Sequence, residues 1–181
     1  MNGNPTGHSG DVVEWAKALI AAPLTEPVVA ELIELAGSAE PDPAKMAAWA
    51  LGFGEIPELL VVGADRALLG VLVDTTRTGA VRGQAAEAAA EQLEFSDRLD
   101  PAPIDAETCL TEMLNDPSAP VRFWSAFGLG KLRTTSAMPS LRAMTVDTTP
   151  VPGWGTVGEE AADAIDTIEG RQSAERLGRK A

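Results

Sequence analysis

Apolar residues recur along most of the chain at the three- and four-residue spacing of amphipathic helices. One such stripe covers residues 11–20 and a second covers residues 25–37, with Asp11 and Thr25 placed to cap the two helices. The alternation of β-branched residues that is typical of strands does not occur. The pattern therefore predicts an all-α chain that begins with a helical hairpin.

From residue 42 onward, one alanine-rich helical motif occurs four times, over residues 43–53, 80–93, 120–132 and 156–168. The equivalent positions Pro43, Val81, Val121 and Val157 follow one another at steps of 38, 40 and 36 residues. Shorter apolar segments that end near an aspartate lie between these copies, at residues 67–74, 109–116 and 140–147. A period in this range, with two helices per unit, is typical of an α-solenoid. Whether residues 54–64 form a helix of their own or extend the one that ends at Asp74 stays open.

The copies resemble the HEAT repeat, in the short form found in phycobilin-lyase-type HEAT proteins. Residues 116–132 combine an Asp, a Val-Arg pair, an Ala and a Leu-Gly pair in the order of that motif. Val81-Arg82 with Ala85-Ala86 also fits, whereas the last copy has Gly158 where the motif has Arg. The resemblance covers about residues 42–169. It implies a short right-handed α-solenoid of about four to five HEAT-like helical hairpins.

Packing of such hairpins needs small residues where helix axes approach closely and larger residues elsewhere. We expect the larger ones to fill the gaps between layers: Trp49, Phe53, Trp124 and Leu129. The resemblance further implies a ladder of ion pairs along the seams between repeats, supported by Asp74 before Arg82 and by Asp116 before Arg122.

Composition and length indicate one folded domain. The chain has 181 residues, of which 45% are hydrophobic and 23% charged, so it is not of a disordered class. We expect a mobile tail over residues 1–10, one domain over residues 11–169 and a basic tail over residues 170–181. The start lacks the pattern of a secretory signal and no apolar run is long enough for a membrane helix, which predicts a cytoplasmic protein with no membrane partner.

The formal net charge of −13 is distributed unevenly. Residues 1–65 hold ten acidic and two basic residues, and residues 87–116 hold nine acidic and one basic residue. Because phosphate binding needs a basic surface, this balance argues against nucleic acid and anionic membranes as partners. It favours a basic protein as the partner, or it simply keeps the protein in solution.

Side chains that could carry chemistry are few. The chain has one Cys and one His, which leaves no disulfide and no metal site of nitrogen and sulfur ligands. Cys109 has no histidine near it in sequence and is interpreted as a packing residue. Residues 153–158 match the dinucleotide pattern G-x-G-x-x-G but follow no strand, so we interpret them as a bent loop between repeats. Glu87, Glu91 and Glu94 have the spacing of a solvated helix face. We therefore predict no catalytic residue, no metal and no cofactor.

The second helix of each hairpin usually lines the concave, ligand-binding face of such solenoids. The exposed residues predicted there to contact a partner are Asp65, Arg66, Asp105, Glu107, Glu112 and Arg142. Trp154 has two interpretations, as a partner contact or as a ring packed on the end of the solenoid. The leading hypothesis is a non-enzymatic protein-binding module, either an immunity- or antitoxin-like inhibitor or an adaptor, with an acidic concave face.

Two other functions stay open. A lyase-like or cofactor-attachment HEAT enzyme or maturation factor would need a deep pocket of convergent polar groups and a carboxylate with a perturbed pKa. A self-assembling scaffold would dimerise through an apolar solenoid end, which Leu19, Ile20 and the stripe from Val28 to Ile33 would provide.

Overall fold

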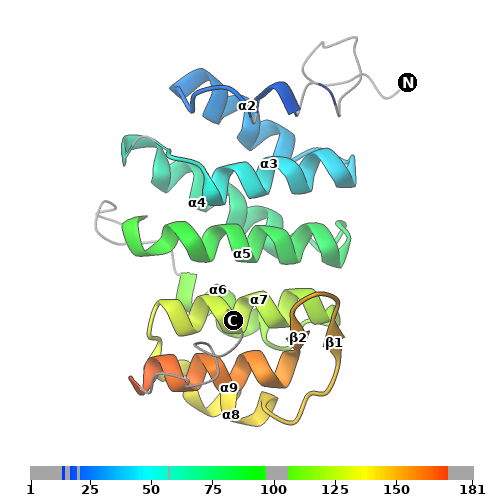
Figure 1. Cartoon of the computed structure of the whole chain (residues 1–181), viewed down its shortest axis with the longest axis vertical. Helices are drawn as coiled ribbons and strands as arrows, with labels where there is room; N and C mark the ends of the chain where they lie inside the picture. The colour runs from blue at the N-terminus through cyan, green and yellow to red at the C-terminus, as the bar shows by residue number, and fades with distance from the viewer. Residues whose placement is uncertain (1–13, 15–16, 20, 57, 97–105, 171–181) are drawn as a thin grey trace, which may run out of the picture.

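The computed structural model describes residues 14, 17–19, 21–56, 58–96 and 106–170, and these residues are mostly helical, as predicted (Figure 1). The described helices are α2 (Glu26–Ala36), α3 (Pro41–Phe53), α4 (Glu58–Val73), α5 (Gly79–Ser96), α6 (Ala106–Met113), α7 (Ala119–Lys131), the 3-10 turn η1 (Thr135–Ala137), α8 (Met138–Met144) and α9 (Val157–Ile168). The predicted motif copies are α3, α5, α7 and α9. The predicted tails lie outside the described residues, except for Gly170.

Each motif helix packs against the helix that precedes it. The pairs are α2 with α3, α4 with α5, α6 with α7 and α8 with α9. The second helices of these pairs also contact one another in order, α3 with α5, α5 with α7 and α7 with α9. In Figure 1 the pairs follow one another along the long axis of the molecule. The described helices thus pack in consecutive pairs around one continuous apolar core.

The structure adds to two expectations about the first half of the chain. The segment predicted as residues 67–74 is the end of a longer helix, α4, which also resolves the question left open for residues 58–64. The helix predicted over residues 25–37 forms a pair with α3, so it begins the row of repeats. Its predicted partner, residues 11–20, lies mostly outside the described residues.

Small residues let neighbouring second helices approach closely. A Cβ added to Gly52 of α3 would lie 2.5 Å from the Ala88 Cα of α5, and one on Gly130 of α7 would lie 2.9 Å from the Ala164 Cα of α9. These contacts place successive second helices side by side, because side chains at those positions would separate them.

The predicted ladder of ion pairs exists, but with different partners. Each arginine of a second helix bonds the aspartate that ends the first helix of the next hairpin: Arg82 Nη2 lies 2.6 Å from Asp116 Oδ2, and Arg122 Nη2 lies 2.8 Å from Asp147 Oδ2. Asp74 instead pairs with Arg77, whose other nitrogens donate to the carbonyls of Gly37 and Ser38 at the end of α2. The pairs therefore join consecutive hairpins.

The same local turn holds each of these aspartates. The Oδ1 atoms of Asp74, Asp116 and Asp147 accept the backbone N–H two residues on, at 3.0, 2.8 and 2.9 Å. One carboxylate oxygen thus shapes the loop while the other accepts from arginine. Hydrogen bonds from Thr76 hold the pKa of Asp74 below its ordinary value, and those from Thr149 and Arg122 do the same for the pKa of Asp147.

A short two-stranded sheet replaces the predicted bent loop before α9. Strands β1 (Pro150–Val151) and β2 (Gly155–Thr156) pair antiparallel, and Gly153 and Gly155 take positive φ angles of 86° and 128° in the turn. Thr156 then caps α9 through a reciprocal capping box with Glu159. The dinucleotide pattern here is thus a structural turn, since the first N–H groups of α9 donate to Asp147, Thr149 and Thr156 oxygens.

Candidate functional site

The residues predicted to contact a partner lie on first helices, and this corrects the predicted location. Arg66 belongs to α4, Glu107 and Glu112 to α6 and Arg142 to α8, whereas the second helices are α3, α5, α7 and α9. Arg66, Glu107, Glu112 and Arg142 are exposed, as predicted. Asp105 lies outside the described residues. The predicted set therefore does not form the face for which it was chosen.

Asp65 is fully buried, which contradicts its predicted exposure. It precedes Leu68 and Leu72 by three and seven residues, so helical periodicity places all three on the inward stripe of α4. A charged residue beside Gly63 and Arg66 resembled a break in the apolar pattern, but the helix continues through it.

The exposed members of the predicted set are also spread over different surfaces. Glu107 and Glu112 are five residues apart, which turns their side chains by about 140° around the α6 axis. Arg142 Nη2 donates to Glu169 at 3.0 Å and so joins α8 to the end of α9. These side chains do not combine into one binding surface.

The second helices present a different surface, which we call the second-helix face. Its residues occupy three equivalent positions per helix, related by the same repeat steps that relate Pro43, Val81, Val121 and Val157. They are Met46, Trp49 and Phe53 on α3; Gln84, Glu87 and Glu91 on α5; Trp124, Phe127 and Lys131 on α7; and Glu160, Asp163 and Thr167 on α9. Among these twelve residues, Trp124 and Glu160 are buried. Three-, four- and seven-residue spacings put each trio on one stripe of its helix.

An exposed aromatic pair marks the α3 part of the second-helix face. The rings of Trp49 and Phe53 are stacked with centroids 5.8 Å apart, and the two residues remain 49% and 44% exposed. They were predicted to fill gaps between layers, and that prediction is wrong for both. They instead line an open depression of about 440 Å³ with Leu24 and Gly54. Exposed aromatic surface of this kind favours contact with a partner.

The α5 part of the face carries carboxylates. Glu87 is half-buried and accepts from Gln84 Nε2 at 2.7 Å, and Glu91 lies one turn farther along the helix. Burial raises the pKa of Glu87, and the negative charge of Glu91 raises it further, against the hydrogen bond from Gln84. Glu87 is therefore less solvated than the prediction of a solvated helix face implied, and burial disfavours its ionised form.

The α7 part of the face is aromatic again. The rings of Trp124 and Phe127 meet edge to face at 5.4 Å, and Trp154 from the β1–β2 turn meets Trp124 at 5.0 Å. Trp154 thus packs on Trp124 while it stays 59% exposed, and its role as a partner contact stays a prediction. Lys131 Nζ lies 5.6 Å from the Phe127 ring centre and bonds Glu91 Oε2 at 2.7 Å. This contact joins the α5 and α7 parts into one surface.

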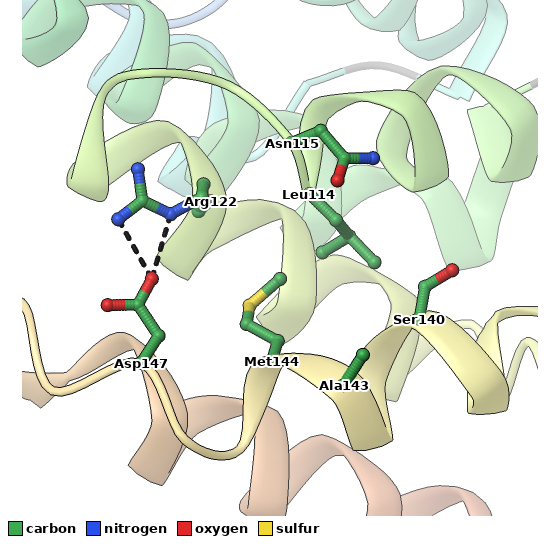
Figure 2. A pocket seen from close by; sticks show the side chains of 7 residues that line it. All are labelled: Leu114, Asn115, Arg122, Ser140, Ala143, Met144 and Asp147. Atoms are coloured by element: carbon green, nitrogen blue, oxygen red, sulfur yellow. Dashed lines mark hydrogen bonds and ion pairs between the residues drawn. The ribbon is translucent and has the colours of Figure 1, made fainter.

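A shallow pocket lies on the other side, between α6 and α8 (Figure 2). It measures about 320 Å³ and is lined by Leu114, Asn115, Arg122, Ser140, Ala143, Met144 and Asp147. Its ionic groups bind one another: the Arg122 guanidinium donates to Asp147, and also to the carbonyls of Asp116 and Pro117. The charge of Asp147 is stabilised, as its lowered pKa indicates, so the pair functions as a structural link.

Other candidate chemistry is limited within the described ranges. Cys109 is a half-buried thiol that packs against the core, as predicted for a packing residue. Among the described residues, no three side chains of the His, Cys, Asp or Glu type come together as metal ligands. Nor does any helix in the described ranges combine the length and apolarity needed to cross a bilayer.

The second-helix face was not predicted, although the repeat alignment already pairs its residues. Aligning the motif copies at the 40-residue step pairs Glu87 with Phe127 and Glu91 with Lys131, which predicts their adjacency on neighbouring helices. Comparison with known proteins adds no assignment: no protein-family model matches the chain, and no curated protein matches it.

Proposed function

We propose that this chain is a non-enzymatic protein-binding module, a HEAT-like α-solenoid of the cytoplasm, that recognises a basic partner protein through the second-helix face. The observation that carries the proposal is the combination on this face of exposed aromatic rings with carboxylates. Trp49, Phe53 and Trp154 provide rings that keep contact area available, and Glu87 and Glu91 lie between them. Aromatic anchors with adjacent charges are typical of protein-binding surfaces.

The overall charge supports the same choice of partner. A net charge of −13 attracts a basic protein over long range and accelerates encounter, and the effect decreases as salt increases. An inhibitor of a basic effector, similar to immunity proteins and antitoxins, is one version of this function. An adaptor that recruits the same partner without blocking it is the other. Activity of the partner in the complex distinguishes them.

The test is affinity capture with matched charge variants. The immobilised chain is incubated with lysate of its source cells and washed at about 50 mM and about 500 mM salt. We expect the wild-type chain to retain a basic protein at the lower salt only. Glu87→Lys on the second-helix face should lose that protein, whereas Glu112→Lys on α6, with the same change of charge, should keep it.

The result also decides between the two surfaces. Loss of the partner with Glu112→Lys or Glu107→Lys, but not with Glu87→Lys, would return the binding site to the first helices. Retention of no basic protein by the wild-type chain, or equal retention by all variants, would contradict the proposed function. Circular dichroism of each variant confirms that it is folded.

A further inference from the structure

Aromatic and acidic side chains alternate from helix to helix on the second-helix face, and this order restricts the sequence of a partner that binds there. Aromatic rings on α3 (Trp49 and Phe53) are followed by carboxylates on α5 and again by aromatic rings on α7 (Phe127 and the Trp154 ring on Trp124). Since α3 contacts α5 and α5 contacts α7, a ligand that crosses the helices meets these three zones in that order. This inference rests on the proposed function.

The spacing of the zones follows from helix packing. Neighbouring packed helices have axes about 8–10 Å apart, so the two aromatic zones are separated by about 16–20 Å. The close Gly52–Ala88 contact places α3 and α5 toward the lower end of that range. An extended chain advances about 3.3 Å per residue, so five or six residues, about 18 Å, reach from one aromatic zone to the other.

Among the described residues, the middle zone holds one carboxylate without an ion-pair partner. Glu87 is half-buried and accepts a neutral hydrogen bond from Gln84 Nε2 at 2.7 Å, whereas the neighbouring Glu91 is paired with Lys131. A cation brought by a ligand would pair with Glu87 and would favour the ionised carboxylate.

The protein itself shows how a cation is accommodated here. Lys131 lies between the Glu91 carboxylate and the face of the Phe127 ring, at 2.7 Å and 5.6 Å. A carboxylate on α5 and a ring on α7 thus hold one ammonium group by an ion pair and a cation–π contact. On the α3 side of the same carboxylate row, Trp49 occupies the repeat position of Glu87 on the neighbouring helix, so a carboxylate and an aromatic ring are again carried by adjacent helices.

We propose that the second-helix face binds an extended segment of the partner protein in which one or two basic residues are flanked by apolar residues about five or six positions apart. A basic residue meets Glu87, next to the existing Glu91–Lys131 pair, and the apolar residues contact the aromatic zones of α3 and α7. The segment lies across the helices, so its order of side chains matches the order of the repeats.

Synthetic peptides of equal length test this directly. The first has two leucines about six positions apart with Lys-Arg between them, the second has the same composition with the leucines adjacent, and the third has Glu-Glu in place of Lys-Arg. Binding is followed by nitrogen–proton correlation spectra of the whole chain, in which backbone and indole signals report where each peptide contacts the protein. We expect the first peptide to bind at least about tenfold more tightly than the other two, with shifts of the α3, α5 and α7 signals.

Matched variants identify the contacts. Trp49→Ala should weaken binding of the first peptide about tenfold or more, whereas Val146→Ala, which removes another exposed apolar side chain, should not. Equal binding of all three peptides, or shifts confined to other elements, would overturn the inference. So would concentration-dependent broadening of the same signals without peptide, because a second copy of the chain would then cover the face. Capture of a basic protein that needs Glu87 but tolerates Trp49→Ala would overturn this inference and leave the proposed function intact.

Discussion

In the loops after α4, α6 and α8, an aspartate at the equivalent position makes the same two contacts three times. One oxygen of Asp74, Asp116 and Asp147 accepts the N–H two residues on, and the other accepts from an arginine. On the second-helix face, by contrast, one equivalent position holds Trp49, Glu87, Phe127 and Asp163 in successive repeats. The same repeat therefore has a chemically uniform seam and a chemically varied face.

The difference follows from what each region has to satisfy. A loop aspartate that closes a turn and meets a partly buried arginine must keep both charge and length, since removal of either partner leaves a buried polar group unpaired. Residues at the outer stripe of the second helices differ in burial as well as in type: Trp49 is 49% exposed, whereas Phe127 packs partly against the core. The variety of the face is thus compatible with selection of its residues by a ligand.

The largest expected effect is on stability and compares an ion pair of the seam between hairpins with one on the second-helix face. Arg82→Met leaves the Asp116 carboxylate, whose side chain is 5% exposed, buried without its cation and should cost about 3–5 kcal/mol of unfolding free energy. Lys131→Met removes a more exposed pair with Glu91 and should cost at most about 1 kcal/mol. Urea unfolding followed by circular dichroism measures both.

Equal losses for the two variants would contradict the distinction between a structural seam and a face that is free to vary. Asp116→Asn is the companion variant: because it removes the other partner, its effect and that of Arg82→Met should be strongly non-additive in the double variant.

The next effect concerns the close approach of the second helices. Gly52→Ala places a methyl group within van der Waals overlap of Ala88 and should destabilise the fold by about 1–3 kcal/mol. Gly70→Ala in α4 is the matched control, since nothing lies within 4 Å of its added Cβ. There alanine should stabilise the helix by about 0.5–1 kcal/mol. Thermal or urea unfolding gives the sign of each change, and the same sign at both positions would contradict the close packing of α3 on α5.

Sequence patterns predicted the repeated part of the fold well, for reasons visible in individual residues. The steps between Pro43, Val81, Val121 and Val157 located all four second helices, because each motif places small and apolar residues where the helices pack. The ladder was predicted but not its partners, since a pattern along the chain does not say whether Arg82 meets an aspartate before or after it. The two short strands were missed, because they consist of residues 150–151 and 155–156, too few for a periodic signal.

The candidate site was predicted less well because exposure depends on the helix register. Charges identified Asp65 as a surface residue, but the register of α4 buries it. Trp49 and Phe53 were predicted to fill gaps between layers because their side chains are large, but both rings lie on the outer stripe of α3 and stay exposed. The contact between Glu91 of α5 and Lys131 of α7 can be predicted only when the repeats are aligned and α5 is known to pack against α7.

A smaller effect is expected where seam and face meet, at the turn that carries Trp154. Thr156→Ala removes the side-chain cap of α9 and should cost about 1 kcal/mol. Thr25→Ala removes a threonine from the N-cap of α2 that makes no side-chain cap hydrogen bond, so it should change stability by only a few tenths of a kcal/mol. Differential scanning calorimetry compares the two, and equal shifts in Tm would show that the capping box adds nothing.

The smallest expected effects have opposite pH dependence in the two regions. Hydrogen bonds lower the pKa of Asp147 on folding, so its ionised form stabilises the fold above pH 5 or so, and this contribution is lost as the pH falls through the lowered pKa. Burial raises the pKa of Glu87, so its ionised form opposes folding at neutral pH, and this penalty disappears as the pH falls below about 4.

The neutral variants isolate these contributions from the rest of the titration. Asp147→Asn should be less stable than the wild-type chain at neutral pH, and the difference should shrink on acidification. Glu87→Gln should be more stable than the wild-type chain at neutral pH, and its advantage should shrink over the same range, because glutamine resembles the protonated acid. Urea unfolding between about pH 3.5 and pH 7 gives both differences. Stability differences of the same sign would mean that ionisation of Asp147 and of Glu87 affects folding in the same direction. The ionised Glu87 would then need no partner cation to compensate its charge.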